Sequence, residues 1–277
     1  MGVFAAFIAP ALAGVFVGVM SGLLGVGGGT IMVPIFRLAF GMSPLASTAT
    51  SLFAIIPTSI SGVVAHTRAK TCVPKLGLAL GVGGAVMSPM GVWLASVSPG
   101  WLVICVAAIV IGFSALKMFK KAVKCAPTPR AGRAGGSSQD ASAKAVPDQP
   151  VLSRKQYLQG VCIGLIAGLA SGYVGVGGGF IMVPLMLAVL DIPMSLASGT
   201  SLIAIMILAI PGVIEQGLLG NIEYLAGIAI VVGSIPGALV GARLVRVVPE
   251  RQLRFIFGGF LLVAAVMLML NEFGILG

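Results

Sequence analysis

The motif SGLLGVGGGTIMVP at residues 21–34 returns as SGYVGVGGGFIMVP at residues 171–184. Eleven of the fourteen positions are identical at an offset of 150 residues. The same offset, without a gap, pairs Gly14 with Gly164, Thr50 with Thr200 and many other residues of the two halves. Self-similarity in one fixed register indicates a duplicated structural unit. We therefore interpret the chain as a tandem duplication of one ancestral half.

The composition of the chain points to a membrane protein. Apolar residues make up 58% of the 277 residues, charged residues only 9%, and the mean hydropathy is +1.13. Soluble domains carry about 25% charged residues, so this chain has too few charges to cover a water-facing surface. Apolar runs of about 20 residues, each long enough to span a bilayer as a helix, recur along the chain. The alternating polarity of a membrane β-barrel does not occur.

Each half divides into five apolar segments. We expect them near residues 3–25, 30–41, 48–65, 76–97, 101–118, 157–175, 180–190, 196–214, 223–245 and 253–270. The second segment of each half is too short to span a bilayer alone, and a glycine cluster separates it from the first. The pattern predicts an all-α integral membrane protein with two repeats, each containing a broken or re-entrant helical hairpin. Eight to ten transmembrane segments result, depending on whether 30–41 and 180–190 span the bilayer fully.

A polar linker joins the two repeats. The predicted domains are a membrane repeat at 1–120, a disordered basic linker at 121–155 and a second membrane repeat at 156–277. Nine basic and two acidic residues lie between Lys117 and Lys155, in a stretch rich in Gly, Ser, Ala and Pro. We interpret the charge as a cytoplasmic loop that obeys the positive-inside rule, and not as a nucleic-acid site, because aromatic residues for base stacking are missing.

The charged loops predict the orientation of the repeats. The loop 66–75 carries three basic residues and no acid, whereas its counterpart 215–223 carries two glutamates and no base. The turn 97–100 is uncharged, whereas its counterpart region holds four arginines. Positive charge thus collects at opposite ends of the two halves, which predicts inverted repeats. We expect a multi-pass protein of the bacterial inner membrane with a cytoplasmic linker and both termini on the outer side.

The glycine clusters are the candidate substrate site. Each interrupts a helix, and the following helix start presents unpaired N–H groups and the positive end of its dipole to an anion. Phosphate-binding loops are not favoured, because neither cluster is followed by the Lys-Ser/Thr of a P-loop. The alternative is a tight helix crossing without a ligand. Pro34 and Pro184 support the breaks.

Hydroxyl groups mark a second pair of candidate helix starts, at 47–51 and 198–201. They can bind a substrate oxygen or simply cap a helix. The predicted substrate-binding residues are Gly27, Gly28, Gly29, Thr30, Thr50, Ser51, Gly177, Gly178, Gly179, Thr200 and Ser201, with Arg37, Ser47 and Ser198 as further candidates. Arg37 either completes the site or lies at the membrane interface. His66 is interpreted as a boundary residue and not as a proton relay.

The four cysteines lack metal-binding spacing, so no metal and no cofactor are expected.

The doubled motif, with Thr-Ser-Leu following in each half, resembles the TauE/SafE sulfite exporter family, also called the toluene sulfonate uptake permease family. The resemblance covers both halves and omits only the linker. It implies transport of small sulfur-containing oxyanions such as sulfite, sulfoacetate or other organosulfonates, but it leaves the substrate and the direction open.

The sequence therefore favours a secondary transporter that works by alternating access of its inverted repeats. The alternatives are a passive anion channel and a non-transporting membrane scaffold whose linker recruits partners. An intramembrane enzyme is disfavoured, because the spans lack paired aspartates, HExxH and an activated Ser with a His base. The expected partners are a small anionic substrate, the lipid bilayer and a second copy in a homo-oligomer.

Overall fold

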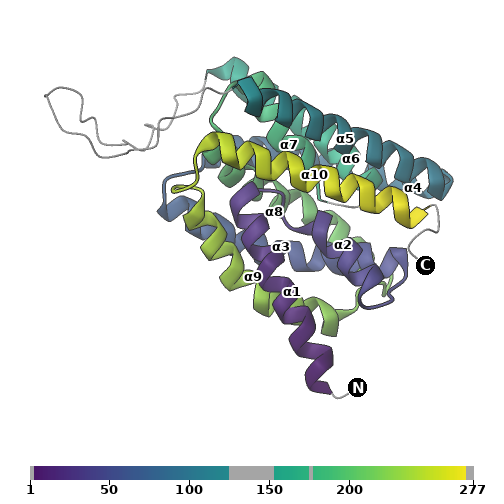
Figure 1. The fold of residues 1–277 in the computed structure, drawn as a ribbon. Coiled ribbons are helices and arrows are strands. Elements are labelled where there is room, and N and C mark those ends of the chain that lie inside the picture. The colour runs from purple at the N-terminus through teal and green to yellow at the C-terminus, as the bar shows by residue number, and fades with distance from the viewer. Residues whose placement is uncertain (1–2, 125–152, 175–176, 273–277) are drawn as a thin grey trace, which may run out of the picture.

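The computed structural model describes residues 3–124, 153–174 and 177–272, and every regular element in these ranges is a helix (Figure 1). The first half contains α1 (Val3–Leu24), α2 (Gly29–Leu38), α3 (Pro44–Arg68), α4 (Pro74–Val97) and α5 (Gly100–Lys124). The second half contains α6 (Arg154–Val174), α7 (Gly179–Leu185), the π-helix η1 (Met186–Leu190), α8 (Met194–Leu218), α9 (Tyr224–Leu244) and α10 (Glu250–Glu272). The predicted all-helical class and the five segments of each half are confirmed.

Several predicted boundaries are wrong. The third helix of each half begins well before the hydroxyl clusters 47–51 and 198–201, so these residues lie inside α3 and α8 and do not start them. In α3 the start is set by Ser43, whose side chain accepts a hydrogen bond from the Ala46 N–H, and by Pro44 at the first helical position. Serine before proline is a strong helix-start signal.

The helices on both sides extend into the predicted linker. Helix α5 continues to Lys124 and α6 begins at Arg154, so both ends of 121–155 are helical. Lysines on long flexible side chains are good helix formers, which explains why α5 extends into the basic run. Residues 125–152, the greater part of the predicted linker, lie outside the described residues.

The helices pack in pairs, and shifting the residue numbers of one pair by 150 gives the residue numbers of its equivalent pair. The most extensive pairing is α1 with α9, and its equivalent, α4 with α6, is almost as extensive. Helix α3 packs on its own counterpart α8, and α5 packs on its counterpart α10 along one face of the molecule (Figure 1). Both halves therefore contribute to every major helix pair, and neither is a separate bundle.

Glycines allow the closest of these pairs to form. A Cβ atom at Gly14 or Gly18 of α1 would overlap the backbone carbonyl of Ile230 or Ser234 in α9. At the equivalent positions of α6, a Cβ atom would overlap backbone carbonyls of α4. Helices surrounded by lipid gain stability from such close backbone approach, because burial of apolar surface gives them little advantage over lipid contact. These glycines therefore have a structural role, since they let α1 approach α9 and α6 approach α4.

The outer surface of the bundle is apolar. Large side chains such as Leu12, Trp93 and Ile109 are more than 60% exposed, which a water-soluble surface of this extent would not tolerate. Within the described residues, α3, α4, α8 and α9 are long and apolar enough to cross a membrane. The apolar helices Pro10–Leu24 and Gly179–Leu190 are shorter. The chain is therefore built as a multi-pass membrane protein.

Candidate functional site at the paired helix breaks

The first glycine cluster breaks the chain between α1 and α2, as predicted. Gly27 and Gly28 both have φ of 80°, and Gly28, with ψ of −17°, is the N-cap of α2. Residues with a Cβ atom rarely adopt this left-handed conformation. The glycines are therefore required for the chain to leave one helix and begin the next within four residues.

The second cluster forms an equivalent break between α6 and α7. Gly177 has φ of 81°, and Gly178 is the N-cap of α7 with φ of 50° and ψ of −23°. Gly175 and Val176 lie outside the described residues. Each break is followed by a short helix with a proline inside it, Pro34 or Pro184. Proline lacks an N–H group, so it leaves a carbonyl of the preceding turn without its helical hydrogen bond.

The two breaks touch each other in the centre of the molecule. A Cβ atom at Gly179 would lie only 2.8 Å from the Gly25 carbonyl oxygen and from the Val26 Cα atom. Equivalent isoleucines hold the breaks from α3 and α8. A Cβ atom at Gly27 would lie 2.8 Å from Ile205 Cγ2, and one at Gly177 would lie 3.0 Å from Ile55 Cδ1. The structure thus brings the predicted glycines of both halves together.

The hydroxyl residues of α3 and α8 surround the breaks but are occupied by hydrogen bonds within the protein. Ser201 Oγ lies 2.6 Å from the Gly25 carbonyl oxygen and 2.8 Å from that of Ser198, and it can donate to either. Ser51 donates to the Thr48 carbonyl oxygen, and Ser47 donates to that of Ser43. In this conformation, these hydroxyls are therefore satisfied by backbone carbonyls of their own helices and, for Ser201, also of the first break.

Thr50 and Thr200 form an equivalent pair of contacts between the halves. Thr50 Oγ1 accepts a hydrogen bond from the Glu223 N–H at 3.0 Å, and Thr200 Oγ1 accepts one from the Val73 N–H at 3.0 Å. Glu223 and Val73 are themselves related by the 150-residue offset. Each threonine therefore ties the central helix of its own half to the start of the fourth helix of the other half.

Two hydroxyl groups at the first break have no hydrogen-bond partner. Ser21 in α1 and Thr30 in α2 are 1% and 3% exposed, and neither side-chain oxygen is bonded. Both flank the N-cap of α2, and the Ser21 Cβ lies 3.6 Å from the position of a Cβ atom on Gly28. A buried hydroxyl without a partner costs about 1–3 kcal/mol. Sequence reasoning selected Thr30 but missed Ser21, although Ser21 and Ser171 both open the repeated motif.

An apolar groove adjoins Thr30. It has a volume of about 550 Å³ and lies between α1, α2 and α10, with Phe16, Met20, Pro34 and Phe260 among its lining residues. The Thr30 hydroxyl oxygen itself is buried. Arg37 lies in the last turn of α2, about 13 Å along the helix from Gly28 at 1.5 Å per residue. The structure therefore places Arg37 away from the break.

His66 is buried in the last turn of α3, where it holds this helix against α1. Its Nε2 donates to the Gly22 carbonyl oxygen at 2.8 Å, and its Nδ1 lies 2.8 Å from Thr71 Oγ1. The ring joins the end of α3 to the last turns of α1, just before the first break.

In the loop after α3, burial raises the pKa of the Cys72 thiol, and a hydrogen bond with Thr67 opposes this shift.

Comparison with known proteins places the chain in a family of transporters. Residues 10–268 match the profile of the family described as sulfite exporter TauE/SafE. Three similar proteins are each named a probable membrane transporter protein. YdhB of Bacillus subtilis is 29% identical over 86% of this chain and 89% of its own length. YunE of the same organism is 26% identical over 87% and 89%. MJ0441 of Methanocaldococcus jannaschii is 23% identical over 94% of both chains.

No solved structure matches the chain significantly. The profile covers both glycine breaks, every helix from α2 to α9, and most of α1 and α10. The predicted resemblance is confirmed over nearly the whole chain, and with it the general class of activity. The chain belongs to the TauE/SafE sulfite exporter family and is a membrane transporter.

Proposed function

We propose that the protein is a secondary transporter of small sulfur-containing oxyanions, such as sulfite, sulfoacetate or other organosulfonates. The observation that carries this proposal is the meeting of two glycine breaks in the core, with two unpartnered hydroxyls beside one of them. The family description names sulfite export, and it supports the sulfur-oxyanion class for this chain.

The donors at the breaks are neutral, so they hold an anion more weakly than a full positive charge would. A helix N-terminus stabilises an anion by about 0.3–1 kcal/mol when exposed and by up to about 2 kcal/mol when partly buried. The N-termini of α2 and α7, with the Ser21 and Thr30 hydroxyls, would offset part of the dehydration of a small oxyanion. Several weak donors still let the anion leave, which a transporter requires.

Alternating access would come from two inverted repeats. The helix pairs and backbone contacts exchanged by the 150-residue offset support a two-fold relation between the halves. The different charge of equivalent loops supports inversion across the bilayer. Lys70 and Lys75 of the first half correspond to the uncharged Gly220 and Leu225, and the loop of the second half carries Glu215 and Glu223. We infer a bacterial inner-membrane location, a cytoplasmic linker and both termini outside. Sites at the interface of inverted repeats, near the bilayer midplane, are typical of secondary transporters.

Flux into proteoliposomes tests the proposal. We expect saturable uptake or efflux of radiolabelled sulfite, and counterflow when the vesicles are loaded with unlabelled anion. Sulfate and sulfoacetate in parallel define the substrate range. Flux that rises linearly with concentration and shows no counterflow would indicate a passive channel. Flux no higher than in empty vesicles would contradict transport of these anions.

A linker deletion separates transport from scaffolding. Removing residues 126–150 leaves every described helix intact, because α5 ends at Lys124 and α6 begins at Arg154. We expect the deletion variant to retain the sulfite flux of the intact protein. Loss of flux in a variant that remains monodisperse and inserted would show that the linker is required for transport, contrary to this expectation.

A further inference from the structure

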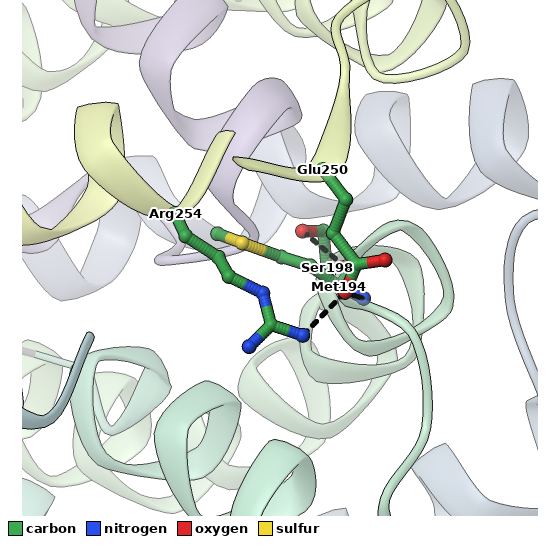
Figure 2. Close-up of polar contacts among 4 residues, drawn as sticks. All are labelled: Met194, Ser198, Glu250 and Arg254. Atoms are coloured by element: carbon green, nitrogen blue, oxygen red, sulfur yellow. Dashed lines mark hydrogen bonds and ion pairs between the residues drawn. The ribbon is translucent and has the colours of Figure 1, made fainter. Parts of the chain in front are cut away.

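The start of α10 contains a buried arginine that is only partly paired. Arg254 is 6% exposed, and its Nη2 contacts Glu250 Oε1 one helical turn earlier (Figure 2). Its Nε and Nη1 are buried and have no hydrogen-bond partner. A guanidinium group carries five N–H donors in a fixed plane, and leaving several of them buried and unpaired is unfavourable. Such a group is suited to bind an acceptor that this conformation does not hold.

The Glu250 carboxylate bridges two groups that attract anions. Its Oε1 accepts from Arg254 Nη2 and also, at 3.3 Å, from the Met194 N–H at the first residue of α8 (Figure 2). The N-terminus of a long helix favours negative charge, and an arginine matches the geometry of an oxyanion. The Glu250 side chain is 39% exposed, so it can leave this position without crossing the core.

The cluster lies at the start of α8, the same helix whose Ser201 contacts the candidate site. Ser198 Oγ donates to the Met194 carbonyl oxygen one turn into the helix, as Figure 2 shows. Ser201 Oγ then contacts the carbonyl oxygens of Ser198 and of Gly25 at the first break. Met194 and Ser201 are seven residues apart, or about 10 Å along the helix axis. An anion that leaves the breaks along α8 would therefore meet Arg254 within a short distance.

The cluster occurs in the second half alone. The positions equivalent to Glu250 and Arg254 in the first half are Gly100 and Ile104. A contact that merely held the duplicated scaffold together would be needed in both halves, as the Thr50 and Thr200 contacts are. The restriction to one half therefore favours a role at one end of the transport path.

We propose that Arg254 and the N-terminus of α8 form a second oxyanion site at one end of the path, which Glu250 occupies when no anion is bound. The inference rests on the proposed anion transport. An arriving oxyanion takes the Arg254 donors, and Glu250 swings outward. When the anion moves on, Glu250 returns and again joins α10 to α8. Glu250 thus competes with the substrate, and Arg254 binds it.

Sulfite flux in proteoliposomes tests both roles. Glu250→Gln keeps an oxygen acceptor for the Met194 N–H but removes the competing charge, so we expect a KM for sulfite several-fold below that of the intact protein. Arg254→Gln removes a charge-assisted hydrogen bond, so we expect a KM about tenfold higher. Arg246→Gln is the matched control, because Arg246 is exposed and precedes α10. It loses the same charge, and its KM should stay within about twofold, as for a screened surface charge.

A double variant separates competition from structural support. If Glu250 acts only by competing for Arg254, Glu250→Gln should no longer lower KM when Arg254→Gln is present. A KM raised by Glu250→Gln, or unchanged by Arg254→Gln, would overturn the proposal while leaving anion transport intact. Absence of flux in the intact protein would overturn both. Should Arg254→Gln not fold, Arg254→Lys keeps the charge without the planar fork, and an unchanged KM in that variant would count against the site.

Discussion

The two helix breaks share one backbone but carry different chemistry. Gly28 and Gly178 cap α2 and α7 in the same left-handed conformation, and equivalent isoleucines pack on both breaks. The residue that follows the glycines is Thr30 in the first half, with an unpartnered buried hydroxyl, and Phe180 in the second, fully buried. The duplication has kept the geometry of the break but not the side chain at the start of the short helix, where Thr30 corresponds to Phe180.

This difference separates what the fold needs from what a substrate needs. Backbone packing across the 150-residue offset constrains both halves, because the α1–α9 contacts at Gly14, Gly18 and Gly22 have α4–α6 equivalents at Gly164, Gly168 and Gly172. A small anion in the centre cannot present the same face to both halves, so polar side chains are free to diverge. Thr30 in the first half and the Arg254–Glu250 pair in the second half are such diverged polar residues. Variants in the shared glycine contacts should act equally in both halves, and variants in the diverged residues should not.

The largest effect is expected at the shared glycine contacts. A valine at Gly18 would overlap the Ser234 carbonyl, and a valine at Gly168 would overlap that of Gly84. No rotamer relieves an overlap with backbone, so each variant should lose about 3 kcal/mol or more. The yield of monodisperse protein in detergent measures this loss. Gly112→Ala, at a position with open space around it, should behave as the intact protein. A large difference between the two valine variants would show that the halves are not packed equivalently.

A smaller structural effect, with complete loss of transport, is expected at the caps of the breaks. Gly28→Leu and Gly178→Leu each force a left-handed conformation that costs a side-chain-bearing residue about 1–2 kcal/mol. The atoms nearest to the new Cβ positions are Val17 Cγ1 at 2.9 Å and Leu208 Cδ2 at 3.0 Å, and both belong to side chains that can shift. The variants should therefore fold to a measurable extent and lose sulfite flux.

Gly41→Ala is the control for backbone strain. Gly41 also has a positive φ, of 63°, but lies in a loop with no atom within 4 Å of a new Cβ. Its alanine variant should be strained to a similar degree and still transport sulfite. Normal flux in Gly28→Leu or Gly178→Leu would refute the placement of the substrate site at the breaks.

Substitution of the diverged residue Thr30 should raise stability and lower transport. Thr30→Val replaces an unpartnered buried hydroxyl by a methyl group of similar volume, which should raise stability by about 1 kcal/mol. If the hydroxyl binds substrate, sulfite flux should fall at the same time. Ser59→Ala is the control, because Ser59 in α3 is also buried and unpartnered. It should gain stability with no change in flux. Unchanged flux in Thr30→Val would assign the first break a structural role only.

The sequence predicted the breaks well because their cause is local. Glycines that must adopt positive φ, followed by a short helix with a proline, are readable in both copies of the motif. The starts of α3 and α8 were predicted a few residues too late, because the hydroxyl clusters were taken as the helix starts. The helices in fact begin after Ser43 and Pro193. The Thr-Ser pairs of both halves were predicted to bind substrate, whereas the hydrogen bonds that they make between the halves depend on which helices meet.

Other residues could not have been found without the tertiary structure. His66 adjoins a basic loop in the sequence, but it is buried because α1 supplies the Gly22 carbonyl for its ring. Arg254 was counted as one of four arginines in a charged end region. Its burial and its unpaired donors arise from the packing of α10 on the rest of the bundle. A residue whose role depends on partners far away in the chain leaves no local pattern to read.

The threonine contacts between the halves should differ in how much they contribute to stability. Thr50→Val and Thr200→Val each leave a backbone N–H without its acceptor, which costs about 1–3 kcal/mol when the group stays dry. Val73 is 4% exposed, whereas Glu223 is exposed, so water can replace the lost acceptor only beside Thr50. The unfolding temperature in detergent should therefore fall more for Thr200→Val, even though the two contacts have equal length. Equal decreases would mean that solvent does not reach Glu223, and that the halves are equivalent here in environment as well as in geometry.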